Sequence, residues 1–530
     1  MRLADCGTAA ALCAVFLKNY WVSEDAYLNF RSVDQLLQGH GPIWNPHERV
    51  QVFTSPLWYG LHALAQASVK EAYLAVFLLS CVCFGLTLFW LRRCTGGGLA
   101  FGFAGLLLVS SNAAFDYTSS GLENVLGYAL SLFALSMCSK LAAAGGGEQR
   151  ALKGLFVAAG ATLLCRHDMA ALIAPLLLWA AWSQRSLIDL RTGLQLGAAL
   201  LLPMAAWTAF SLLYYGSAFP NPAYAKLSAG FPRSVHLRFG LQYLSGLAQS
   251  DALSVVCLVA GLGVLAWQRT AASAALAMAI ALHMLYVVYV GGDYMQGRFV
   301  SYEILLACAV LARNASALLD GSARVAVPLV LLMYALSYER TPLNTAFAQP
   351  KPAAATNAHG PSYVMDARAT FGLYTSLYSY VHAHDLTNYP EHPLAIEGRK
   401  LARSSERVAV IQAAGMFGWA AGTDKIIIEA HGITDPLLAR LPASTFRGVG
   451  HYARYRPEGY IAGLGSGKVQ LEDPALNQYY AKLALITQSP ALCTWQRLTT
   501  IALLNLNTYE PLLQHFIDDK IRGKQQWPKP

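Results

Sequence analysis

Charge is scarce in this chain. Of its 530 residues, 13% are charged and 55% are hydrophobic, whereas soluble proteins carry about 25% charged residues. This scarcity excludes an ordinary soluble enzyme, and the high apolar and aromatic content excludes a disordered chain. Long apolar stretches indicate instead a membrane protein with several spanning helices.

The shortage of charge is uneven along the chain. Residues 1–338 hold 35 charged residues, about 10% of their positions, and residues 339–530 hold 34, about 18%. We therefore predict a mainly α transmembrane domain over residues 1–338 and an α/β domain over residues 339–530. The net charge of +9 contains no long basic run, so it gives no indication of nucleic-acid binding.

Several catalytic and metal-binding motifs are missing. The sequence has no P-loop, no Rossmann glycine pattern, no GxSxG and no zinc spacing, which argues against ATP, NAD, serine-hydrolase and zinc chemistry. The C-terminal part holds one cysteine, Cys493, so it cannot form an internal disulfide. No cofactor is expected, although a divalent metal ion stays open because carboxylate ligands have no readable spacing.

Eleven apolar stretches are candidates to cross the membrane. With the N-terminus inside, the predicted inner loops carry an excess of Lys and Arg, as the positive-inside rule requires. An odd number of crossings then places residues 339–530 outside the bacterial inner membrane. Two alternatives stay open: the first stretch as a signal peptide, and 153–183 as one span or two. The stretches are 5–22, 72–91, 98–114, 122–138, 153–165, 169–183, 193–213, 252–267, 271–290, 300–313 and 325–338.

Two segments outside these stretches have recognisable local patterns. The first outer loop, residues 23–71, shows helical apolar spacing before and after a Gly-Pro break at residues 39–42, which predicts two interfacial helices. Residues 407–412 and 425–429 have the composition of buried strands, with a helix-like segment at 413–419 between them. We expect a small βαβ unit there.

The polar residues that remain unexplained gather at the predicted outer ends of the spans. The pair Glu24 and Asp25 follows the first span, where low dielectric raises the pKa of a carboxyl and makes it a candidate general base. Arg166, Lys226 and Arg298 suit a phosphate. Structural explanations compete with each of these: a solvated helix end, a local ion pair, or a side chain reaching the lipid headgroups.

Seven segments, beginning with the one that holds Glu24 and Asp25, match a known family in their order along the chain. They resemble the AftB-like and TfpW-like arabinofuranosyltransferases of the GT-C class, which take sugar from a polyprenyl-phosphate carrier. The resemblance covers about residues 20–460. Two departures are Glu24, where the family reads Asp, and the triplet at 166–168, where relatives read Arg-Pro-Glu/Asp-Gly. The matching segments are 24–31, 39–50, 120–123, 220–226, 292–299, 432–442 and 450–460.

This resemblance implies a GT-C membrane fold with a C-terminal extracytoplasmic domain. It also implies transfer of arabinofuranose from polyprenyl phosphate to a type IV pilin or a cell-envelope glycan. It makes Asp25 the catalytic carboxylate, a base in an inverting reaction or a nucleophile in a retaining one. Lys226, Arg298 and Arg166 would bind the donor phosphate. The implied sugar or acceptor contacts are Glu24, Tyr27, Arg31, His40, Glu123, Asp293, Tyr294, Asp435 and His451.

Other functions stay open at this point. They are a GT-C enzyme for another sugar, a transporter, and a non-catalytic envelope or flagellar factor. A transporter needs ionisable residues in the middle of its spans. Here these residues lie at the predicted outer ends, which favours chemistry at the membrane surface.

Overall fold

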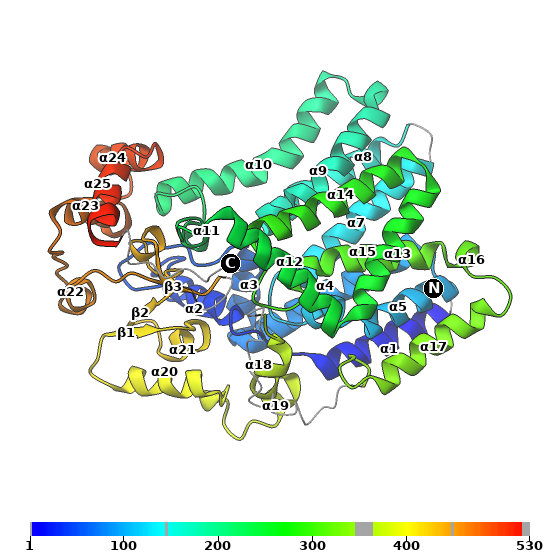
Figure 1. The fold of residues 1–530 in the computed structure, drawn as a ribbon, viewed down its shortest axis with the longest axis horizontal. Helices are drawn as coiled ribbons and strands as arrows, with labels where there is room; N and C mark the ends of the chain where they lie inside the picture. The colour runs from blue at the N-terminus through cyan, green and yellow to red at the C-terminus, as the bar shows by residue number, and fades with distance from the viewer. Residues whose placement is uncertain (1–2, 144–146, 345–363, 447–449, 522–530) are drawn as a thin grey trace. The chain divides into compact units, whose positions relative to one another are not determined.

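The computed structural model describes residues 3–143, 147–344, 364–446 and 450–521 (Figure 1). These residues form two compact units. Unit 1 comprises residues 1–23, 73–204 and 236–382, and unit 2 comprises residues 24–72, 205–235 and 383–530. Nearly all of the predicted first outer loop therefore belongs to the same unit as residues 383–530. The predicted boundary at residue 338 separates a transmembrane domain from an α/β domain, and it stays a prediction.

Unit 1 is built from helices. It contains α1 (Leu3–Asn19), α4 (Ala72–Thr95), α5 (Gly98–Ser110), α6 (Asn112–Phe115), α7 (Asn124–Ala143), α8 (Gln149–Cys165), α9 (Ala170–Ser183), most of α10 (Leu190–Tyr214) and of α12 (Arg233–Ser250), α13 (Ala252–Gln268), α14 (Ala271–Val290), α15 (Ser301–Arg313), α16 (Ala315–Leu318), α17 (Ala323–Ser337), α18 (Ala367–Thr375) and α19 (Leu377–Val381), with short 3-10 turns η1 (Asp116–Thr118), η2 (His167–Met169), η3 (Arg185–Leu187) and η4 (Arg298–Val300).

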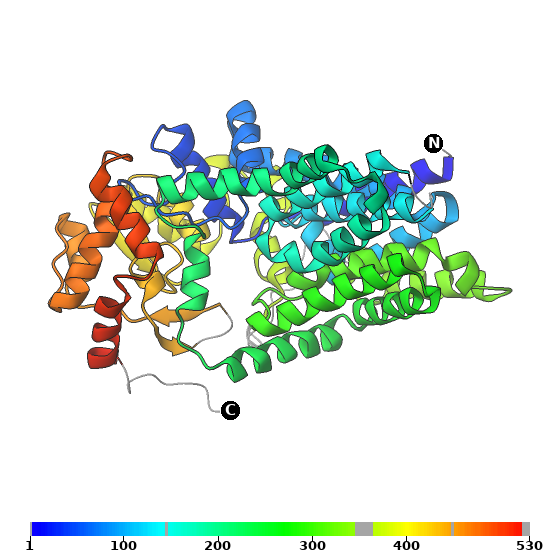
Figure 2. The same ribbon diagram turned by 90° about the horizontal axis from the view of Figure 1, so that it is seen from above.

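The helices of unit 1 pack side by side. The extensive contacts are those of α7 with α8, α9 with α14, and α13 with α15, and both ribbon views show these cyan and green helices adjacent (Figures 1 and 2). Close approach is helped by small residues. A Cβ at Gly160 of α8 would lie 2.2 Å from the Ala199 carbonyl oxygen of α10, and one at Gly261 of α13 would lie 2.7 Å from the Ala307 Cβ of α15. Glycine at these positions lets the backbones touch.

All eleven predicted stretches overlap a helix, but few of these helices are by themselves both long enough and apolar enough to cross a membrane. Among the described residues, α4, α7, α10 and α14 are long and apolar enough, and the number rises to six if the bent pairs of α5 with residues 112–118 and of α12 with α13 are counted. Eleven crossings therefore stay a prediction. The stretch 153–183 forms two helices, α8 and α9, which are separated at residues 166–169.

The helix α10 exposes an apolar surface of the kind that faces lipid. Its most apolar 18-residue window has a mean hydropathy of 1.8, yet only 11% of that window is buried within the protein. Leu194, Leu201 and Leu202 are each at least 60% exposed. Such a surface in water would carry a large hydrophobic cost, so this helix has the composition of a lipid-facing element.

Unit 2 mixes helices and short strands. Its helices are α2 (Ala26–Leu37), α3 (Pro56–Val69), α11 (Asn221–Leu227), α20 (Pro393–Arg403), α21 (Gly415–Ala420), α22 (Tyr460–Ser466), α23 (Pro474–Gln488), α24 (Trp495–Asn505) and α25 (Glu510–Phe516), with turns η5 (Leu386–Asn388), η6 (Leu438–Arg440) and the π-helical η7 (Ile517–Ile521). Its strands are β1 (Val408–Ile411), β2 (Ile426–Glu429), β3 (Ala443–Phe446) and β4 (Tyr452–Arg454).

The predicted βαβ unit is confirmed. Strands β1 and β2 pair in parallel, with Val408 opposite Ile426, and α21 lies between them in sequence. Strands β3 and β4 form a separate antiparallel pair. The C-terminal part therefore contains α and β structure, with little sheet.

The two helices predicted for the first outer loop are also present. Ser55 caps α3 by accepting a hydrogen bond from the Trp58 amide, and Pro56 occupies the first turn, where a missing N–H costs nothing. Between α2 and α3, Gly39 and Gly41 adopt positive φ angles of 86° and 97°. The chain therefore turns where the sequence predicts a break.

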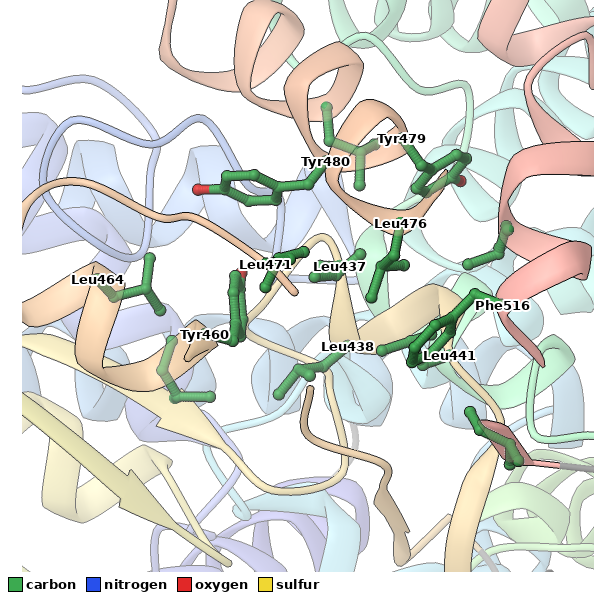
Figure 3. Close-up of a cluster of buried hydrophobic side chains, with 14 residues drawn as sticks. Leu437, Leu438, Leu441, Tyr460, Leu464, Leu471, Leu476, Tyr479, Tyr480 and Phe516 are labelled. Carbon is green, nitrogen blue, oxygen red and sulfur yellow. The ribbon is translucent and has the colours of Figure 1, made fainter. Parts of the chain in front are cut away.

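A hydrophobic core stabilises the C-terminal part of unit 2. Leucines of the segment 437–441 pack against aromatic side chains of α22, α23 and α25, including Tyr460, Tyr479 and Phe516 (Figure 3). This core fixes the segment that follows β2, and that segment carries one of the predicted site residues, Asp435.

Candidate functional site

The predicted site residues fall into two groups, one in each unit. Unit 2 holds the carboxylate pair and most of the residues around it, and unit 1 holds a buried network of guanidinium and carboxylate groups. The first group is Glu24, Asp25, Tyr27, Arg31, His40, Lys226, Asp435 and His451, and the second is Glu123, Arg166, Asp293, Tyr294 and Arg298.

The carboxylate pair stands where α2 begins. Glu24 is 5% exposed and accepts a hydrogen bond from the Met416 amide at 3.1 Å. Asp25 is half-buried, occupies the N-cap position of α2 and does not use its side chain to cap the helix. The positive end of the helix dipole favours a negative charge at this position.

The two carboxyls have unequal surroundings. Burial, followed by the charges of Asp25 and Glu429, raises the pKa of Glu24 to about 8, against the bonds from the Met416 and Gly415 amides. At neutral pH Glu24 is therefore mostly protonated, and a proton on Glu24 removes its repulsion of an ionised Asp25. Two neighbouring carboxyls in unequal surroundings are the arrangement by which many sites separate acid and base roles.

A third carboxylate, that of Glu429, lies at the end of β2. Glu429 accepts hydrogen bonds from the His431 amide at 3.1 Å and from His431 Nδ1. The ring of His431 meets that of His451 edge-on, with centroids 4.9 Å apart. His451, predicted from the sequence, is thereby tied through His431 to a carboxylate that influences Glu24.

The side chain of Arg31 joins α2 to the βαβ unit. It is fully buried and donates to the carbonyl oxygens of Trp44 at 3.0 Å, Lys425 at 2.6 Å and Gly418. Its guanidinium also lies 4.7 Å from the Trp44 ring centroid. These contacts give Arg31 a structural role in positioning the helix that carries Asp25, and its predicted sugar contact stays a prediction.

Tyr27 is buried at the second position of α2, four residues before Arg31. Its ring packs 4.7 Å from Phe30 and 5.3 Å from Trp419 of α21, between ring centroids. Like Arg31, Tyr27 contacts α21. The residues that follow Asp25 therefore also fix the position of α2 against α21.

Asp435 stabilises the turn that follows β2. It accepts hydrogen bonds from the Leu437 and Leu438 amides at 3.0 and 2.7 Å and from the Tyr460 hydroxyl at 2.9 Å. Burial raises its pKa to about 6, against these hydrogen bonds. The amide of Asn221 donates to three backbone carbonyls of the same turn, each at 3.0 Å.

Two predicted residues are exposed. His40 Nδ1 lies 2.7 Å from Gln35 Oε1 at the end of α2. Lys226 is on α11, and its Cε lies 4.0 Å from the position that a Cβ on Gly450 would take. Both remain candidates for substrate contact.

In unit 1, one carboxylate joins two guanidinium groups. Glu123 Oε1 lies 2.9 Å from Arg166 Nη1 and 3.2 Å from Arg298 Nη2. Glu123 is buried, and the two guanidiniums supply the opposite charges that a buried carboxylate needs. The sequence places these three residues far apart, and the packing of α7, η2 and η4 unites them.

Each guanidinium has a further acidic partner. Arg166 bonds both oxygens of Asp168, and Arg298 Nη1 lies 3.6 Å from Asp293 Oδ2. The other oxygen of Asp293 accepts from the Tyr294 amide at 2.8 Å. Three carboxylates thus surround two guanidiniums, and each guanidinium pairs with two of them. That Arg166 and Arg298 bind the donor phosphate stays a prediction.

Sequence reasoning missed several charged residues. Glu429 is the last residue of a predicted strand and His431 follows it, and the carboxyl end of a parallel strand is where ligand sites commonly lie, so a signal was available. The buried pair His283 and Glu303 gave none, because each is a single polar residue in an apolar stretch. Within the described residues, no group of three or more His, Cys, Asp or Glu is arranged to hold a metal ion.

Comparison with curated proteins supports the resemblance. The chain is 31% identical over 256 residues to a terminal beta-(1→2)-arabinofuranosyltransferase of Mycobacterium tuberculosis, a match that covers 44% of this chain and 39% of that protein. It is 30% identical over 346 residues to the enzyme of the same name from Corynebacterium glutamicum, covering 56% and 48%. The chain thus spans less than half the length of these relatives. No family model matches it.

Among solved structures, two of ArnT from Cupriavidus metallidurans align with the chain at 12% identity. The apo structure gives a TM-score of 0.49, with 91% of each chain covered. The structure bound to undecaprenyl phosphate gives 0.43, with 82% of this chain and 87% of the other covered. The sequence matches show a chain that is similar over part of its length to terminal arabinofuranosyltransferases.

Proposed function

We propose that this protein is a membrane glycosyltransferase that moves an arabinofuranosyl residue from a polyprenyl-phosphate carrier to an extracytoplasmic acceptor. The observation that carries the proposal is the 30–31% identity to two arabinofuranosyltransferases. The paired carboxyls at the start of α2 and the lipid-facing helix α10 support it, because the reaction needs a base and a membrane-embedded donor.

In this proposal Asp25 is the general base. Its carboxylate removes the proton of the acceptor hydroxyl while that oxygen forms a bond to the anomeric carbon, and the bond from that carbon to the phosphate oxygen breaks. A protonated Glu24 places no second negative charge beside Asp25. A single displacement inverts the anomeric configuration. A product of retained configuration would assign Asp25 as a nucleophile instead.

The leaving polyprenyl phosphate needs a cation. Lys226, Arg298 and Arg166 are the proposed ligands, and Lys226 is the exposed member of the three. Arg298 and Arg166 already hold Glu123, so phosphate binding to either would replace an existing carboxylate contact. Charge stabilisation of a leaving group is the usual function of such residues.

The test is an assay with purified protein. We expect Asp25→Asn to insert, fold and bind donor, but to transfer sugar at least about 100-fold more slowly, since a missing general base costs that much or more. Polyprenyl-phospho-arabinofuranose is the donor, an arabinan oligosaccharide is the acceptor, and mass spectrometry detects the added pentose. Glu397→Gln, an exposed carboxyl on α20, is the matched control.

Full transfer by Asp25→Asn rejects the assignment of the base. Transfer of another sugar, but not arabinofuranose, by the wild-type protein rejects the substrate and retains the enzyme class. Mass analysis of envelope proteins and polysaccharides with and without this gene then selects the acceptor, because a pilin that loses one pentose mass identifies a protein acceptor.

A further inference from the structure

A cavity of about 540 Å³ opens in unit 2, between residues 217–230 and the C-terminal part of the chain. Its wall is formed by residues of α11, η6, α23, α24 and α25. The volume falls within the range of pockets that take small organic ligands. Glu24, Asp25 and Glu429 do not line it, so it is separate from the carboxylates described above.

The wall carries a fixed guanidinium beside two phenol rings. Arg440 lies 4.5 Å from the ring centroid of Tyr224 and donates to the Pro436 carbonyl at 2.8 Å and to Ser217 Oγ at 3.2 Å. Tyr479 is close to the same groups. Burial raises its pKa, Arg440 opposes this rise, and Glu510 and Tyr224 add to it.

The charges and polarity of the wall select a class of ligand. One cation, Arg440, is balanced by one anion, Glu510, so the wall favours a neutral ligand over a phosphate. The side-chain amides of Asn505, Asn507 and Gln514 add donors and acceptors. The remaining lining includes leucines at 227, 504 and 513. Polar groups for hydroxyls beside apolar and aromatic faces for C–H groups fit a carbohydrate.

We propose that this cavity is a carbohydrate-binding subsite that holds the acceptor glycan away from the reacting carboxylates. Such a subsite implies that the acceptor is a glycan chain of several sugars. One part of the chain would bind in the cavity, and the hydroxyl that receives the new sugar would lie on another part. The inference depends on the proposed function for the choice of sugar, and binding itself needs no transfer.

Two variants alter the wall without disturbing the backbone. Asn507 adopts φ 59°, a conformation that glycine takes freely, so Asn507→Gly removes an amide at no backbone cost. Glu510→Lys reverses the charge of an exposed side chain. His515→Gln is the control, because His515 is exposed on the same helix and does not line the cavity.

The experiment titrates the full chain in detergent with a linear arabinofuranose hexasaccharide, without donor, and measures affinity by calorimetry and saturation-transfer NMR. We expect the wild-type protein and His515→Gln to bind equally, and both cavity variants to bind about tenfold more weakly or worse. Binding by both variants at wild-type strength overturns the proposal. So does a wild-type protein that ignores the hexasaccharide at millimolar concentration, or one that binds only a pilin peptide.

Failure of this inference is distinguishable from failure of the proposed function. If hexasaccharide binds and the cavity variants weaken it while no sugar is transferred, the transferase proposal fails and the subsite stands. If sugar is transferred and the cavity variants bind normally, only the subsite fails. If both proposals hold, Asp25→Asn still binds the hexasaccharide.

Discussion

Glu24 has unusual surroundings for a carboxyl. Its carboxyl is buried between the Met416 amide and two further carboxylates, and burial with these charges raises its pKa to about 8. In the unfolded chain the same carboxyl titrates near its ordinary value of 4.5. Folding therefore takes up a proton between these two pH values.

A stability difference follows from this proton. Because the folded state holds the proton that the unfolded state releases, the contribution of Glu24 is fully present below about pH 4.5 and is lost as pH rises through about 8. Glu24→Gln keeps a neutral side chain at every pH. We expect its melting temperature to rise relative to wild type as pH increases from 5 to 8, by an amount equivalent to roughly 2–4 kcal/mol.

Thermal unfolding in detergent at several pH values measures this difference. Glu406→Gln, at an exposed position, should show no such trend. A constant offset between Glu24→Gln and wild type across the range would mean that Glu24 is ionised in the folded protein at neutral pH.

At the scale of elements, an ion-pair network connects helices of unit 1. Arg166 stands between α8 and α9 and joins Asp168 to Glu123, which directly precedes α7. Its guanidinium also lies 4.8 Å from the Phe299 ring centroid. Charges as enclosed as these are costly to separate, because a partner left behind has neither water nor an opposite charge.

We expect Arg166→Gln to destabilise unit 1 by about 3 kcal/mol, the usual cost of breaking a buried ion pair from one side. The double variant Arg166→Gln with Asp168→Asn should recover part of that loss, because it removes the orphaned charge. Melting temperatures of both variants provide the measurement, and Arg185→Gln is an exposed control. Equal stability of Arg166→Gln and wild type would show that the network is not what holds these helices together.

At the scale of the whole molecule, the arrangement in the membrane follows from charge bias and the number of crossings. Inner loops rich in Lys and Arg predict a cytoplasmic N-terminus, and an odd number of spans predicts an outer C-terminal part. The exposed Cys493 is the single cysteine of residues 339–530, so the chain carries its own probe of this topology.

A membrane-impermeant maleimide should label Cys493 in intact spheroplasts, because the predicted topology exposes it on the outer side. Mass spectrometry of the tryptic peptide identifies the labelled position, and Cys493→Ser should lose the signal. Labelling of Cys493 only after the membrane is broken would reverse the predicted orientation or change the number of crossings by one.

Local patterns were sufficient for much of the secondary structure. The two helices α2 and α3 follow from apolar spacing and a Gly-Pro break, and the βαβ unit follows from two isoleucine- and valine-rich runs around a helical segment. Helix α12 escaped prediction, since its mean hydropathy is lowered by Arg233, His236 and Arg238. The sequence also did not predict that residues 24–72 and 383–530 belong to one compact unit. No local pattern indicates a contact between segments so far apart in the chain.

Hydropathy and motif order are properties of neighbouring residues. They were therefore sufficient to indicate a membrane protein, a carboxylate pair after the first apolar stretch and the resemblance to arabinofuranosyltransferases. The folded structure raises the pKa of Glu24, since burial and the charge of Glu429, about 400 residues away in sequence, outweigh the hydrogen bond from the Met416 amide. It also decided that Arg31 binds backbone carbonyls and that a cavity exists beside Arg440. Burial and distance set electrostatic energy, and both are defined only once the chain is folded.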